Sequence, residues 1–72
     1  MANGARISLK AARINADLTQ EQAAKGVGVS ITTIHLWETG ERIPTVDKAF
    51  ALAELYMVPL DRINFVRKVE SK

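Results

Sequence analysis

Apolar side chains recur at the three- and four-residue spacing of an α-helix along most of this chain. Ser8 can cap a first helix that runs to about Ala16, and Thr45 can cap a fourth that runs to about Tyr56. A fifth helix is expected to begin at Leu60, and no strand pattern precedes residue 62. The spacing therefore predicts an all-α fold. One side of the first helix carries Leu9, Ala12 and Arg13, and one side of the fourth carries Val46, Ala49, Phe50, Leu52, Ala53 and Tyr56.

Two short helices joined by a tight corner are predicted between residues 19 and 40. Thr19 and Gln22 have the spacing of a capping box, in which each side chain bonds to the backbone of the other residue. Gly28 can adopt the positive φ that ends a helix sharply. Ser30 can cap the next helix, and Gly40 follows its last turn.

The second of these helices has two different sides. Val29, Ile34 and Trp37 should form its buried stripe, and the small side chain of Ala24 lets it cross closely over the preceding helix. The corner would hold the opposite side outward, toward solvent. A braced helix presented in this way suits the major groove of DNA, which admits one α-helix. The outward residues are Ile31, Thr32, His35 and Leu36.

The carboxyl-terminal segment is ambiguous. Residues 63–69 have apolar positions that fit a helix, but they also alternate as in an edge strand. Their apolar residues are candidates for dimer contacts and equally for the core of the monomer. These candidates are Leu60, Phe65, Val66 and Val69.

Length and composition narrow the class of protein. With 72 residues, the chain should form one domain, in which residues 1–6 and 68–72 are flexible. Having no cysteine and one histidine, it offers no disulfide and no metal site, and we expect no cofactor. No signal peptide or membrane span is expected, since no apolar run approaches about 20 residues. We expect no enzyme either, because Asp47 and Glu54 lie at a surface and His35 has no neighbouring nucleophile. A net charge of +2 does not by itself indicate nucleic acid.

The corner helices and their flanks resemble the Cro/C1-type (XRE-like) phage repressors and bacterial regulators. The resemblance begins near residue 7, is most specific from Leu18 to Gly40, and continues through Pro44 and Leu52 to about residue 65. It implies a compact five-helix, lambda-repressor-like DNA-binding domain whose second and third helices form the helix-turn-helix. It also implies a cytoplasmic, nucleoid-associated regulator that binds double-stranded DNA sequence-specifically.

The outward side of the third helix is the predicted base-contacting surface. In the family, the positions that match Ile31, Thr32 and Leu36 reach base edges, and here they offer contacts to thymine methyl groups and one hydroxyl. His35 can donate to a guanine acceptor, or it is simply solvated. This side has no Arg, Lys, Asn or Gln, which points to readout by shape, water or apolar contact. The alternative is that Ile31 and Leu36 contact another protein.

Several polar residues around this helix are predicted to contact DNA phosphates. Gln20 stands at the start of the second helix, where backbone N–H groups attract anions, although it can also simply fill the first helical turn. Glu41 departs from the basic residue that is common in the family and should weaken binding. The predicted phosphate contacts are Gln20, Thr33, Thr39, Arg42 and Lys10, and Lys25 and Arg6 add a diffuse attraction.

The resemblance also assigns structural roles. Arg13 and Glu38 match family positions that form a largely buried ion pair between the first and third helices. Ala23 stands where a larger apolar residue is usual, and Met57 where a glycine normally closes the fourth helix. Both departures should weaken the fold.

Two functions remain open from the sequence. The first is a small phage or prophage repressor that occupies an operator as a homodimer, at least on DNA. The second is an anti-repressor or antitoxin-like module that uses the same scaffold to bind a protein through Ile31, His35 and Leu36. Neither function requires a membrane.

Overall fold

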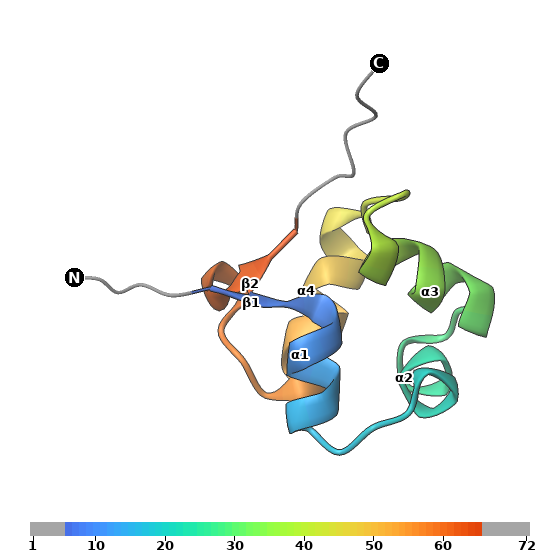
Figure 1. The fold of residues 1–72 in the computed structure, drawn as a ribbon, viewed down its shortest axis with the longest axis horizontal. Helices are drawn as coiled ribbons and strands as arrows, with labels where there is room; N and C mark the ends of the chain where they lie inside the picture. The colour runs from blue at the N-terminus through green and yellow to red at the C-terminus, as the bar shows by residue number, and fades with distance from the viewer. Residues whose placement is uncertain (1–5, 66–72) are drawn as a thin grey trace.

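The computed structural model describes residues 6–65, and its helices surround a small apolar core (Figure 1). In these residues there are four α-helices, one 3₁₀ turn and two short strands. In chain order they are β1 (Ile7–Ser8), α1 (Leu9–Asn15), α2 (Gln20–Val27), α3 (Ile31–Thr39), α4 (Val46–Tyr56), the 3₁₀ turn η1 (Leu60–Arg62) and β2 (Ile63–Asn64). The predicted flexible ends, 1–6 and 68–72, lie outside the described residues except for the exposed Arg6.

The predicted helix starts are confirmed at all four caps. The hydroxyl of Thr19 accepts from the backbone N–H of Gln22 at 3.0 Å, and the Gln22 side chain accepts from the Thr19 N–H at 2.9 Å. This is a complete capping box. Ser8, Ser30 and Thr45 accept in the same way from the N–H three residues later. Because these bonds involve neighbouring residues only, the local sequence is enough to determine them.

Glycines end both α2 and α3, and the first of them, Gly28, lies in the corner between the two helices. Gly28 ends α2 with φ at 75°, and Gly40 ends α3 with φ at 85°. Both angles lie in the left-handed region, which side chains with a Cβ disfavour. The short turn from Gly28 to Ser30 then sets α3 across α2, as predicted (Figure 1).

The predicted fifth helix is wrong. Leu60–Arg62 form a 3₁₀ turn, and Ile63–Asn64 then extend as β2, which pairs in parallel with β1 at the start of the chain. This pairing also contradicts the expectation that no strand precedes residue 62. It places Ile63 opposite Ile7 and leaves Ile63 only 2 % exposed. Burial against β1 thus outweighs local helix preference, because it removes a large apolar side chain from water. Of the ambiguous residues 63–69, Ile63–Asn64 form a strand and Phe65 belongs to no helix or strand. The residues from 66 onward lie outside the described part.

The core lies where α1, α2, α3 and α4 meet. Small residues on α2 let its neighbours approach closely. A Cβ added at Gly26 would lie 2.9 Å from the Cδ2 of Leu55 on α4, which shows how near these two helices are. The buried residues that form the apolar core cluster are Leu9, Ala12, Ala23, Ala24, Val27, Ile34, Leu52, Ala53, Tyr56 and Ile63.

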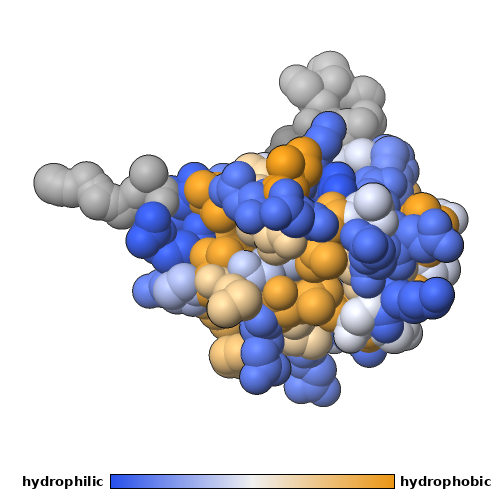
Figure 2. Space-filling model, turned by 90° about the horizontal axis from the view of Figure 1, so that it is seen from below, coloured by the Kyte–Doolittle hydropathy of each residue, from blue (hydrophilic) through white to orange (hydrophobic). Residues whose placement is uncertain are grey.

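Not every apolar residue at helical spacing is buried. Val46 and Phe50, which are four residues apart on α4, are 70 % and 57 % exposed. They lie on a different side of α4 from Ala49, Leu52 and Tyr56, which are buried. Figure 2 shows apolar side chains gathered in the middle of the face seen from below, with hydrophilic side chains around them. The large apolar side chains exposed on the described surface are Ile14, Ile31, Ile43, Val46, Phe50 and Met57.

Replacing Met57 with Gly should raise the free energy of unfolding. Met57 ends α4 at φ 58° and ψ 45°, a left-handed conformation that costs a residue with a Cβ about 1–2 kcal/mol. Its side chain is 88 % exposed and contributes little packing that the change would remove. The greater freedom of glycine in the unfolded chain offsets part of the gain, so we expect a net increase of about 1 kcal/mol in urea unfolding. Met57→Ala, which keeps the Cβ, is the control. Equal stability of the two variants would contradict the strain argument.

Candidate nucleic-acid interface

Helix α3 presents one side to solvent and buries the other. Ile34 is 1 % exposed, whereas Ile31 is 48 % exposed. Thr32 and His35 are also exposed, and Leu36 is half-buried. On the inner side, Trp37 and Val29 are partly buried against the core. Of the three residues in the predicted stripe, Ile34 is therefore the one that is fully buried. The arrangement leaves the outer side of α3 free of covering chain from residues 6–65 (Figure 1).

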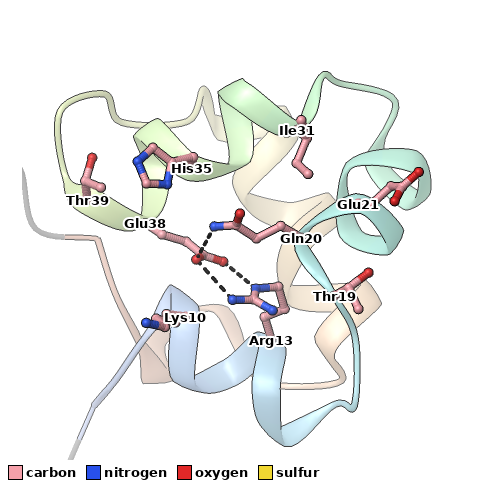
Figure 3. A pocket seen from close by; sticks show the side chains of 9 residues that line it. All are labelled: Lys10, Arg13, Thr19, Gln20, Glu21, Ile31, His35, Glu38 and Thr39. Atoms are coloured by element: carbon pink, nitrogen blue, oxygen red, sulfur yellow. Dashed lines mark hydrogen bonds and ion pairs between the residues drawn. The ribbon is translucent and has the colours of Figure 1, made fainter.

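A hollow of about 760 Å³ lies between the outer side of α3, the start of α2 and α1 (Figure 3). Of the predicted phosphate contacts, it brings together Lys10, Gln20 and Thr39, and of the predicted base contacts Ile31 and His35. Thr32, Thr33, Leu36 and Arg42 do not line it. The complete lining is Lys10, Arg13, Thr19, Gln20, Glu21, Ile31, His35, Glu38 and Thr39.

Two residues of this lining were not among the predicted site residues. The sequence predicts Thr19 only as a helix cap and predicts no role for Glu21. Both stand at the start of α2, which was already a predicted anion-binding position, so their location in the sequence was the available signal. The carboxylate of Glu21 adds a negative charge to the lining, at the opposite edge of the hollow from the cation of Lys10 (Figure 3).

Glu38 on α3 connects three helices at the base of the hollow (Figure 3). Its Oε2 accepts from Arg13 Nε at 2.6 Å, and its Oε1 accepts from Arg13 Nη2 at 3.3 Å. The same Oε1 accepts from Gln20 Nε2 at 3.0 Å, and Arg13 Nη1 donates to the Leu18 carbonyl at 2.8 Å. The side chains of Arg13 and Glu38 are only 10 % and 5 % exposed. This cluster therefore fixes α3 against α1 and α2 through polar contacts as well as apolar ones.

The electrostatic effects in this cluster partly oppose each other, but the net effect raises the pKa of both Arg13 and Tyr56. The hydrogen bond to Glu38 raises the pKa of Arg13, against the lowering effect of burial. Burial also raises the pKa of the Tyr56 hydroxyl to about 12, and the nearby negative charge of Glu38 acts in the same direction. Arg13 thus stays charged and Tyr56 neutral at physiological pH, so the carboxylate of Glu38 keeps its cationic partner.

Several predicted phosphate donors are already hydrogen-bonded within the protein. The Thr39 hydroxyl donates its proton to the Leu36 carbonyl at 3.1 Å. The Thr33 hydroxyl lies 2.9 Å from that of Ser30. One N–H of the Gln20 amide is used by Glu38, which leaves the other for a ligand. Contacts of these residues with DNA stay predictions, and in this conformation Thr39 has no proton to offer.

The basic residues Lys10, Arg42 and Lys48 differ in their exposure and in their hydrogen bonds within the protein. Arg42 is exposed on the loop after α3, and its backbone N–H donates to the Leu36 carbonyl at 3.2 Å, which ties the loop to the last turn of the helix. Lys10 lines the hollow and is exposed. Lys48, in contrast, donates to the Val27 carbonyl at 3.1 Å and so completes the end of α2. Lys10 and Arg42 are thus both exposed, and their contacts with phosphates stay predictions.

A metal-binding cluster and a membrane-spanning helix are both absent from the described residues. Within residues 6–65 there is no group of three or more His, Cys, Asp or Glu side chains that could hold a metal ion. In the same range, none of the helices has the length and apolar character needed to cross a bilayer.

Comparison with known proteins places the chain beside a helix-turn-helix family and a phage repressor. A family model described as helix-turn-helix (HTH_3) matches residues 9–63. The cryptic phage CTXphi transcriptional repressor RstR of Vibrio cholerae is 33% identical over 66 residues, which are 83% of this chain and 60% of the relative. The chain thus spans about three fifths of the length of that repressor. No solved structure matches the chain.

Proposed function

This chain belongs to the helix-turn-helix family, and from that membership we propose that it is a transcriptional regulator that binds double-stranded DNA. It would occupy an operator by placing α3 in the major groove. The name of its relative describes a phage transcriptional repressor, which supports repression as the regulatory outcome. A small phage or prophage protein of this type is the biological setting that we infer.

One observation carries the proposal, namely the contrast between the two sides of α3. Ile34 is 1 % exposed and anchors the helix, while Ile31 is 48 % exposed at its first turn. In a helix-turn-helix, the first residues of the second helix contact base edges while the first helix crosses the phosphate backbone. The outer side of α3 therefore has both the rigidity and the accessibility that groove binding requires.

The hollow beside α3 supports a phosphate position. The start of α2 exposes backbone N–H groups that its capping box does not use, and such groups favour an anion. Lys10 adds a positive charge from α1, and Arg42 adds a second from the loop beyond α3. Glu21 opposes them, so we expect modest affinity for a single copy.

Two copies on a palindromic site would supply the rest of the affinity. A single module of this size covers too little DNA for tight specific binding, and dimers place two recognition helices one helical turn apart. Leu60 and Phe65, which were candidates for the contact between copies, are partly buried against the core of the monomer. Val66 and Val69, the other two candidates, lie outside the described residues.

Reversal of one charge tests the proposal. Duplexes selected from a random library of about 20 bp, long enough for two half-sites, would be bound at low salt in a gel-shift assay. Arg42→Glu should weaken binding at least about tenfold, since a like charge facing phosphate costs more than about 1.4 kcal/mol. Arg62→Glu, an equal change of charge on the exposed η1 turn, is the matched control and should have a much smaller effect.

The outcomes separate the two functions that the sequence left open. Equal losses for the two variants would show that only net charge matters, which contradicts a specific contact by Arg42. If no duplex is retained at low salt and high protein concentration, the proposal of DNA binding fails. The protein-interaction module would then be the better account of the exposed side of α3.

A further inference from the structure

The outer side of α3 has few groups that can hydrogen-bond to bases. Its sequence, ITTIHLWET, contains no Arg, Lys, Asn or Gln, which are the residues that read bases through paired hydrogen bonds. Its exposed polar residues are Thr32, His35 and Thr39, and the Thr39 hydroxyl already donates to the Leu36 carbonyl. A regulator with this helix must obtain sequence specificity in another way.

The neighbouring polar side chains do not fill this gap. The amide of Gln20 already donates to Glu38 at 3.0 Å. The hydroxyls of Thr33 and Thr39 are bonded to Ser30 and to the Leu36 carbonyl. Exchanging these bonds for bonds to bases would gain little free energy, and the Gln20 amide keeps one further N–H for a ligand.

What α3 does present is aliphatic surface. Ile31 is 48 % exposed on its first turn, and Leu36 is half-buried more than one turn further along the helix. Between them, Thr32 adds a methyl group on the exposed side. In the major groove, the one apolar group on the base edges is the C5-methyl of thymine, and aliphatic side chains recognise it by contact.

We propose that this protein selects its operator mainly through thymine C5-methyl groups, which Ile31, Thr32 and Leu36 contact from the outer side of α3. The inference rests on the proposed function, because it concerns how the same surface distinguishes one DNA sequence from another. Ile31 is the main specificity-determining residue, since it has the largest exposed aliphatic side chain on the helix. His35 adds a hydrogen bond of secondary weight.

The expected effect follows from the burial of methyl groups. Burying one CH₂ or methyl group contributes about 0.8 kcal/mol, which is a factor of about four in affinity. If two methyl groups are contacted, removing both should weaken binding at least about tenfold. A specific duplex should therefore contain thymines, and their methyl groups should matter more than any single hydrogen bond.

Uracil in place of thymine removes the methyl group and keeps base pairing. A duplex would first be selected by the intact 72-residue chain from a random library of about 20 bp, and then synthesised with thymine or with uracil throughout. The thymine duplex should bind at least about tenfold more tightly in a fluorescence-anisotropy titration. In Ile31→Ala this preference should fall about fourfold, because one aliphatic contact is lost.

Ile14→Ala is the matched control, because Ile14 is 51 % exposed on α1 and does not line the hollow. It should leave the preference for thymine unchanged. Equal affinity of the wild-type protein for the two duplexes, or a selected sequence without thymine, would overturn the inference while DNA binding itself stands. Failure to bind any duplex at low salt would instead overturn the proposed function.

Discussion

Replacing Glu38 with Gln should lower the free energy of unfolding by about 3–5 kcal/mol. The change leaves the Arg13 cation, whose side chain is 10 % exposed, without its negative partner. It also removes the charge of the carboxylate that accepts from Gln20. The contact through which Glu38 joins α1, α2 and α3 is therefore weakened. A domain of this size has a free energy of unfolding of only about 4–11 kcal/mol, so much of the protein would unfold at moderate temperature.

Two further variants identify the cause of this loss. Glu54→Gln removes an exposed carboxylate on α4 and should change stability by less than about 0.5 kcal/mol. Combining Arg13→Met with Glu38→Leu removes both charges and should recover most of the loss, since an apolar pair often replaces a buried ion pair without cost. Urea unfolding followed by circular dichroism measures all three. A loss for Glu38→Gln no larger than that for Glu54→Gln would contradict the assigned role of the buried pair.

Raising the salt concentration from about 50 to about 200 mM should weaken DNA binding on the order of a hundredfold. Lys10 and Arg42 are the two cations best placed to neutralise phosphates, so a dimer would neutralise about four. Each neutralised phosphate releases counterions and contributes about −0.9 to the slope of log affinity against log salt, which gives a slope of about −4.

The same titration distinguishes the number of copies on the DNA. One copy would give a slope of about −2 and a loss of roughly tenfold over the same range. Arg42→Glu should make the slope shallower, whereas Arg62→Glu should not. Affinity that does not depend on salt would contradict the phosphate contacts proposed for Lys10 and Arg42.

The helix starts could be predicted because the interactions that determine them are local. Ser8, Thr19, Ser30 and Thr45 each bond to an N–H three residues away, so the sequence around each cap contains all the needed information. The end of the chain could not be predicted in the same way. Ile63 is extended because it pairs with Ile7, which is distant in the sequence although adjacent in space. No local pattern indicates that partner.

The sequence predicts which side chains lie on each side of α3 better than it predicts the hydrogen bonds between helices. Spacing alone places Thr32 and Leu36 on the side of α3 opposite to the stripe that Ile34 and Trp37 form. It does not show that Gln20 donates to Glu38, because that bond depends on how α2 and α3 cross. Nor does helical spacing distinguish the buried Leu52 from the exposed Phe50, since the width of the core depends on which neighbouring helices pack against α4.

The most direct test of the account is an NMR titration of the isotope-labelled protein with a selected duplex. The account predicts that the largest amide shift changes fall at Ile31, Thr32, His35 and Leu36 and at the start of α2. Amides of Val46 and Phe50 on α4 should change least. Binding that shifts the α4 amides and leaves those of α3 unchanged would contradict the claim that the outer side of α3 is the DNA-contacting surface.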